Sequence, residues 1–238
     1  MIPWTLLGTA NIPNNGGELK LTRRENEFSI HLTGIRGELM NSRTHCSEIA
    51  LAELGCAHIL GVENRTVLVG GLGMGFTLSA ALKATTVSSQ VVVAELIPEV
   101  IEWNKGPLGE CANRPLNNTR VQVHLGDVAG LFNKPQPTYD AILLDVDNGP
   151  EGFTHTGNNN LYSLPSLIAI RQTLHPGGVL AVWSAWNDPK FTQQLKKARF
   201  VVETKTVRAH KGKGSCHTIY LAKKIADTGN KGRGTRSR

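Results

Sequence analysis

The chain has 238 residues, a length that suits one domain with small additions and a sizeable core. Its 40% hydrophobic and 19% charged residues are typical of a globular protein, and no apolar run approaches the ~20 residues of a membrane helix. Much of the net charge of +7 lies in residues 223–238, so the body of the chain lacks the basic excess typical of nucleic-acid-binding proteins.

The first residues, MIPWTLLGTANIP, lack a basic segment and are interrupted by Pro3, so we expect no signal peptide and no membrane partner. The four cysteines form no C-x-x-C pair and show no metal-ligand spacing. Reduced thiols, a cytoplasmic location and no bound metal are therefore expected.

Residues 1–40 are expected to form a small β element, because Glu18–Thr22 and Phe28–Leu32 alternate apolar and polar residues. A helix up to Gly61 follows, and a dense polar group that includes Asn41 precedes it. Two interpretations stay open for this group. Ser47 can cap the helix, or members such as Asn41 can contact a substrate.

The stretch from Thr66 to Glu95 predicts a strand, a glycine turn, a helix over about 76–83 and a second strand. Gly71, Gly73 and Gly75 allow a ligand to approach the backbone closely, and the helix that follows presents unpaired N–H groups. Glu95 ends the second strand, where a carboxylate can accept hydrogen bonds from both hydroxyls of a ribose. The stretch thus predicts a nucleoside site.

The spacing of the glycines distinguishes between nucleosides. A dinucleotide fingerprint requires a glycine where this chain has Phe76. The pattern present is G-x-G-x-G, which is similar to that of enzymes dependent on S-adenosylmethionine. A purely structural turn is the alternative.

Strands and helices continue to alternate after Glu95, which predicts an α/β fold with a Rossmann-like doubly wound sheet and a closing antiparallel strand pair. We expect one nucleoside-binding catalytic domain over 41–225 and a disordered basic tail over 226–238. The expected elements are helices over 98–105, 163–174 and 188–198, and strands over 121–124, 141–144, 179–183, 200–207 and 217–222.

Asp127 follows a strand in the context LGDV. Its carboxylate can accept a hydrogen bond from an adenine amino group while the Val128 N–H donates to the ring. A helix cap is an equally good interpretation of Asp127.

The loop DVDNGPEG places Asp145, Asp147 and Glu151 after one of the most apolar strands of the chain. Clustered carboxylates suit a cationic amine substrate, because one of them can bind its ammonium group and another can remove a proton. Crowding of like charges raises the pKa of a carboxylate, which favours a base. An acidic turn and a divalent-metal loop are the alternatives.

With these residues together, the chain resembles the spermidine/spermine synthase family, within the class I methyltransferase fold. The resemblance covers roughly 38–186 and rests on VGGLGMG at 69–75, Glu95, Gly126–Asp127 and DVDNGPEG. It implies Asp145 as catalytic acid/base, with Asp147 as a second catalytic acid that helps to orient and deprotonate the amine. It further implies Tyr162 as a wall of the substrate pocket, with Glu151 a further substrate contact. It also implies S-adenosylmethionine or its decarboxylated form as co-substrate, an amine acceptor, and compatibility with a homodimer.

Two departures from the family pattern leave the donor and the acceptor open. Gly73 stands where the family has an acid that holds the aminopropyl ammonium, and Asp147 follows Asp145 by two residues where the family has three. Aminopropyl transfer, methyl transfer from intact S-adenosylmethionine, and nucleoside or RNA binding without turnover are the three functional hypotheses, in that order.

Overall fold

The computed structural model describes residues 2–34, 37–133, 136, 138–146, 161–210 and 213–225. Asp147, Glu151 and the basic tail at 226–238 therefore lie outside the described residues. None of the helices in the described ranges is long and apolar enough to cross a membrane.

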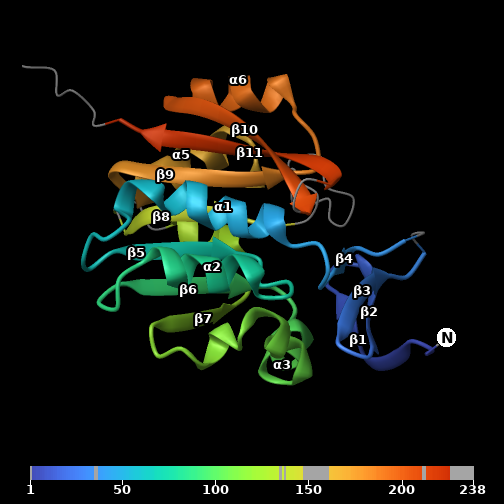
Figure 1. The fold of residues 1–238 in the computed structure, drawn as a ribbon. Coiled ribbons are helices and arrows are strands. Elements are labelled where there is room, and N and C mark those ends of the chain that lie inside the picture. Colours follow the sequence, from blue (N-terminus) through green and yellow to red (C-terminus); the bar gives the residue numbers. More distant parts are fainter. Residues whose placement is uncertain are drawn as a thin grey trace, which may run out of the picture.

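A seven-stranded sheet with the order β10-β11-β9-β8-β5-β6-β7 forms the centre of the fold (Figure 1). Neighbouring strands from β9 to β7 are parallel, whereas β11 is antiparallel to both β9 and β10. This is the predicted doubly wound sheet with its closing antiparallel pair. The strands are β5 (Thr66–Gly70), β6 (Gln90–Glu95), β7 (Val121–Leu125), β8 (Tyr139–Leu144), β9 (Leu174–Ser184), β10 (Phe200–His210) and β11 (Lys213–Lys224).

Helices cover both faces of the sheet and bury a core on each. One core joins α1 (Cys46–Cys56), α2 (Phe76–Ala84) and α3 (Pro98–Lys105) to the side chains of alternate strand positions, such as Val67 and Val69. The other joins η4 (Val128–Asn133), α5 (Leu164–Thr173) and α6 (Pro189–Lys197) to the opposite positions, such as Leu68. The short 3-10 turns η1 (Ala57–Ile59), η2 (Pro107–Ala112) and η3 (Pro115–Asn117) complete the connections.

Side-chain caps begin two of the helices where the sequence predicts them. Ser163 accepts a hydrogen bond from the Ser166 N–H at the start of α5, and Asp188 accepts one from Lys190 N–H at the start of α6. The α1 helix differs, because His45 occupies its N-cap position and no side chain caps it. Ser47 therefore does not cap this helix.

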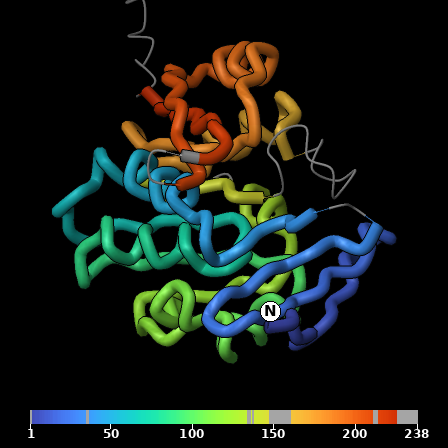
Figure 2. The backbone as a smooth tube through the Cα atoms, turned by 45° about the vertical axis from the view of Figure 1, so that its right-hand side comes forward, coloured from blue at the N-terminus to red at the C-terminus, as the bar shows by residue number. Residues whose placement is uncertain are grey.

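The N-terminal element is a separate antiparallel sheet with the order β1-β2-β3-β4, twice the number of strands expected. Its strands are β1 (Thr5–Ile12), β2 (Gly17–Arg24), β3 (Glu27–Leu32) and β4 (Met40–Asn41). The small sheet stands beside the carboxyl ends of the parallel strands, and the turned view brings it forward (Figures 1 and 2). The small sheet therefore lies opposite the glycine turn of the larger sheet.

Candidate functional site

The turn between β5 and α2 depends on glycine at two positions. Gly71 has a φ of +91°, and a Cβ there would lie 2.4 Å from the carbonyl oxygen of Asp145. Gly75 has a φ of +84° and is the N-cap residue of α2, where a Cβ would lie 3.0 Å from Asn104 Oδ1. The turn therefore packs tightly against the end of β8 on one side and α3 on the other.

Glu95 fixes the same turn from the end of β6. Its Oε2 accepts a hydrogen bond from Leu72 N–H at 3.0 Å, and its Oε1 accepts one from Ile97 N–H at 2.9 Å. The residue is 8% exposed, and burial raises the pKa of its carboxyl group above the ordinary value. Hydrogen bonds from backbone N–H groups, those of Gly73 and Leu96 included, oppose this rise in pKa.

A cavity of about 320 Å³ lies between the glycine turn and the small N-terminal sheet. The Rossmann-like domain contributes Gly71, Gly73, Glu95, Asp127 and Val128 to its walls. The N-terminal sheet and the segment around it contribute Ile12, Asn14, Leu19, Ile30, Leu39 and Met40. The cavity thus has polar groups on the side of the Rossmann-like domain and a mainly apolar wall on the side of the N-terminal sheet, as a nucleoside site requires.

A second cavity of about 100 Å³ adjoins the first. Gly73 and Asp145 line both cavities, together with Leu39 and Met40. Asn41, Glu48 and Trp183 are among the residues that line the second cavity alone. Asp145 therefore borders both spaces, a position suited to a group that acts between a nucleoside and a second substrate.

Asp145 has an unusual electrostatic environment. Burial and the nearby charge of Glu48 raise the pKa of Asp145 to about 7, although a hydrogen bond from Thr77 opposes the change. Thr77 Oγ1 donates that bond to Asp145 Oδ2 at 2.6 Å. A carboxyl group that titrates near neutral pH can accept a proton from a substrate and release it again.

Glu48 lies in the first turn of α1 and is a second acid of this site. Burial raises the pKa of Glu48, and the Ser47 hydroxyl, which donates to Glu48 Oε2 at 2.6 Å, opposes the rise. Glu48 has no distinctive sequence pattern, because the helix dipole alone explains an acid in a first helical turn. Thr77 was not predicted either, because a threonine at the start of a helix has no pattern that indicates a functional role.

Asn41 and Asp127 each have local hydrogen-bonding partners as well as a place at a cavity. Asn41 Oδ1 accepts from Thr44 N–H at 3.1 Å and from Arg43 N–H at 3.0 Å, which orders the chain before α1. Asp127 Oδ1 accepts from Ala129 N–H at 2.8 Å, so it caps η4 and also lines the larger cavity. Both interpretations offered for Asp127 are thus compatible with its position.

Two of the predicted site residues lie away from both cavities. Gly75 lines neither cavity and instead faces Asn104 and Pro115. Tyr162 also lines neither cavity; it is 3% exposed and packs in the core against Phe191 with ring centroids 5.4 Å apart. Asp147 and Glu151 lie outside the described residues, so their positions stay predictions.

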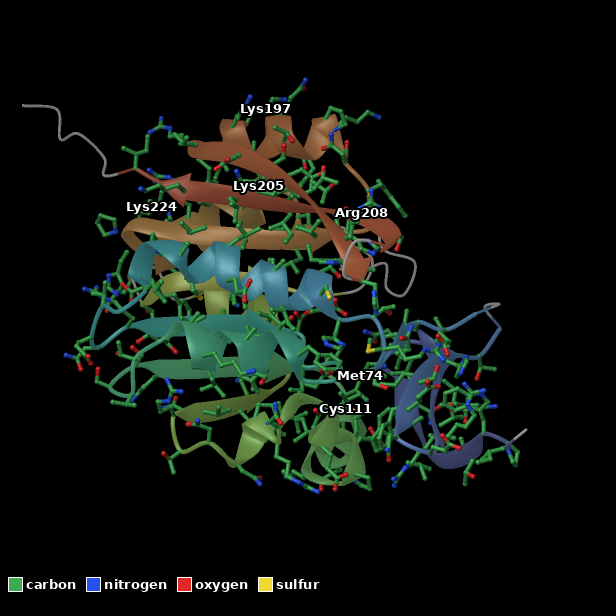
Figure 3. All side chains as sticks on the ribbon, viewed as in Figure 1. Met74, Cys111, Lys197, Lys205, Arg208 and Lys224 are labelled. Carbon is green, nitrogen blue, oxygen red and sulfur yellow. The ribbon has the colours of Figure 1, made fainter. Side chains whose placement is uncertain are left out.

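No lysine, arginine or histidine is among the described residues that line the two cavities, although Glu48, Glu95, Asp127 and Asp145 are. Among the labelled basic side chains, Lys197, Lys205 and Lys224 on α6, β10 and β11 lie well away from Met74, which borders the second cavity (Figure 3). The carboxyl groups around the two cavities therefore favour cationic ligands.

Within the described ranges, no three histidine, cysteine or acidic side chains are grouped to hold a metal ion.

Comparison with known proteins places these features in a family. The model of the spermine/spermidine synthase domain matches residues 50–207. A polyamine aminopropyltransferase of Prochlorococcus marinus is 30% identical over 123 residues, which are 51% of this chain and 41% of that protein. A putrescine N-methyltransferase of Nicotiana tabacum is 30% identical over 119 residues, 49% of this chain and 28% of that protein. The matches thus cover less than half of either relative.

A solved structure agrees with the fold. The crystal structure of a spermidine synthase in complex with the transition state analogue AdoDATO has a TM-score of 0.70 and 16% sequence identity. The superposition covers 93% of this chain and 73% of that chain. The likeness extends over both sheets and supports the class I methyltransferase type of architecture.

Proposed function

The chain belongs to the spermine/spermidine synthase family, and on that premise we propose that it transfers an aminopropyl group from decarboxylated S-adenosylmethionine to an amine acceptor. The observation that carries the proposal is the set of four carboxyl groups around the two cavities, with no basic side chain among their described walls. A decarboxylated donor brings a sulfonium and an ammonium to this site. An intact donor adds a carboxylate, which these side chains would repel.

The nucleoside would occupy the larger cavity. Glu95 accepts hydrogen bonds from the ribose hydroxyls, and Asp127 with the Val128 N–H holds the adenine. The apolar side chains of the N-terminal sheet cover the ring from the opposite side. This orientation directs the sulfonium towards Gly73 and Asp145, which border both cavities.

The acceptor amine would enter the smaller cavity as an ammonium ion. Asp145 accepts one of its protons and so exposes the nitrogen lone pair. The lone pair attacks the carbon next to sulfur, a C–N bond forms, and the C–S bond breaks with its electrons left on sulfur. The products are an extended amine and a neutral thioether nucleoside. We propose that Asp147 and Glu151 help to orient the acceptor from the loop after Asp145.

Methyl transfer from intact S-adenosylmethionine to a small amine is the second candidate. Two points favour it: by the family resemblance, Gly73 stands where an acid is expected, and one relative is a putrescine N-methyltransferase. The same proton acceptor, Asp145, would serve either reaction, since both begin with an ammonium ion. The two candidates differ in the donor and in the nucleoside that remains.

The test is to incubate the purified protein with each donor and a panel of mono- and diamines, and to identify the products by mass spectrometry. Aminopropyl transfer leaves methylthioadenosine and adds three carbons to the amine. Methyl transfer leaves S-adenosylhomocysteine and adds one. Absence of either product with every amine would contradict both candidates, and the Asp145→Asn variant controls for contaminating activity.

A further inference from the structure

Two carboxyl groups share the smaller cavity, and the proposed mechanism uses one of them. Asp145 comes from the end of β8, and Glu48 comes from the first turn of α1. Each accepts one short hydrogen bond from a hydroxyl: Thr77 Oγ1 donates to Asp145 and Ser47 Oγ donates to Glu48, both at 2.6 Å. Neither carboxyl group is paired with a cationic side chain in the ranges that the structure describes.

Two ionised carboxylates in such a space are costly, because each is partly removed from water and repels the other. Retaining one proton between them removes the repulsion without any change in packing. An ammonium ion that enters the cavity provides the missing positive charge, and the pair can then be fully ionised. The state of the pair is therefore coupled to the presence of a cationic substrate.

We infer that Glu48 is a positioning residue for Asp145: the two carboxyl groups hold one proton in the free protein, and the charge of Glu48 keeps Asp145 competent to accept a proton from the acceptor. This inference rests on the proposed function for its catalytic meaning. The sharing of the proton is a property of the free protein and can be measured without turnover.

The surroundings of the pair leave few other groups to produce this effect. The segments that face the cavity are β4 with the residue before it, α1, the glycine turn with the start of α2, the end of β8, and β9. They bring Glu48 and Asp145 as the titratable side chains among its described walls. His45 and His217 do not line the cavity but contact residues that do: His45 stacks on Phe76 with ring centroids 4.3 Å apart, and His217 packs against Trp183 with ring centroids 4.7 Å apart. Glu95 and Asp127 belong to the larger cavity, and Asp147 follows Asp145 in the undescribed loop.

The experiment is a titration of the aspartate carboxyl carbons by ¹³C NMR between pH 4 and pH 9, with Asp145→Asn used to assign the signal. The Glu48→Gln variant preserves the shape of the side chain and removes its charge, so the Asp145 midpoint should fall by about one pH unit. Glu53→Gln makes the same change on an exposed residue of α1 that lines neither of these cavities. The Asp145 midpoint in this control variant should match that of the wild type.

A second variant keeps the test decisive if Glu48→Gln does not fold. Glu48→Ala removes the same charge with a smaller side chain, so the Asp145 midpoint should fall in this variant too. An Asp145 midpoint that is the same in wild type and in a folded Glu48 variant overturns the inference.

Activity provides an independent readout. If the protein transfers the group, the acidic limb of kcat/KM against pH should move to lower pH in Glu48→Gln and stay in place in Glu53→Gln. A shifted NMR midpoint in a protein without transfer activity would support the carboxyl pair and contradict the proposed function. Transfer activity together with an unshifted Asp145 midpoint would support the proposed function and contradict the carboxyl pair.

Discussion

Thr77 and Asp145 meet across the site: the hydroxyl of Thr77 lies 2.6 Å from Asp145 Oδ2 and donates a hydrogen bond to it. Thr77 is the second residue of α2, immediately after the glycine turn, and Asp145 directly follows β8. The contact therefore ties the candidate acid/base to the element that would hold the nucleoside. It fixes one carboxylate oxygen and leaves the other for a substrate.

Asp145→Asn should reduce group transfer at least about 100-fold, because an amide cannot accept the proton that the acceptor must lose. Nucleoside affinity should change little, since Glu95 and Asp127 remain. Steady-state rates and calorimetric titration with the nucleoside measure the two effects separately. Unchanged turnover would remove Asp145 from the mechanism.

The same variant should stabilise the fold at alkaline pH. The pKa of Asp145 is raised to about 7 in the folded state, so the carboxyl group favours folding while protonated and loses this contribution as pH rises from about 4 to 7. Asp145→Asn removes the dependence. The difference in melting temperature between variant and wild type should therefore be small at pH 5 and amount to several degrees at pH 8, for a gain of about 1–3 kcal/mol.

Asp188→Asn is the matched control for this stability experiment. Asp188 caps α6, a role that asparagine fills equally well, and it lies outside both cavities. The difference in melting temperature between Asp188→Asn and the wild type should not increase with pH. A wild-type stability that rises between pH 5 and pH 7 relative to Asp145→Asn would have the wrong sign for this account.

Glu95→Ala should weaken nucleoside binding by about 1–3 kcal/mol, because charge-assisted hydrogen bonds are lost and two backbone N–H groups lose their acceptor. Calorimetric titration measures the affinity. Glu99→Ala, at an exposed position in the first turn of α3, is the control and should bind as the wild type does. Equal affinities for Glu95→Ala and wild type would mean that the ribose lies elsewhere.

Gly71→Ala should destabilise the protein by about 2–4 kcal/mol, because alanine there combines a φ of +91° with a Cβ 2.4 Å from the Asp145 carbonyl oxygen. Gly130→Ala is the control, since no atom lies within 4 Å of its added Cβ. Urea denaturation distinguishes the two. Similar unfolding free energies for both variants would show that the turn tolerates a side chain.

Local patterns predicted the Rossmann-like domain well, because buried parallel strands and capped helices leave clear marks in a sequence. Ser163, Asp188 and Glu95 each occupy the place that such patterns indicate. The strand β1 was missed because Leu6 and Leu7 are consecutive, exposed apolar residues and break the alternation that identifies a strand. The strand expected over 179–183 is longer in the structure, because β9 also includes Leu174, which pairs with Tyr139; a register shift between Tyr139 and Ala141 interrupts the ladder at residues 175–178.

Most of the predicted residues that line the cavities follow strands, whereas Asn41 was predicted from the polar group before α1. Glu48 and Thr77 come from helices that tertiary packing brings to Asp145, and no local pattern reports such packing. Tyr162 is a residue that the sequence assigned to the pocket and the structure places elsewhere. Its position downstream of an acidic loop suggested a pocket wall, but its side chain packs against Phe191 in the core. Proximity in the sequence to an acidic loop does not determine whether a side chain before a helix faces the cavity or the core.

The proposed donor preference rests most directly on the carboxyl groups around the two cavities. The decisive measurement is isothermal titration of the purified wild-type protein with decarboxylated and with intact S-adenosylmethionine under identical conditions. We predict at least tenfold tighter binding of the decarboxylated form, because the carboxylate of the intact form meets no basic side chain among the described walls. Tighter binding of the intact form would contradict aminopropyl transfer and favour a methyltransferase.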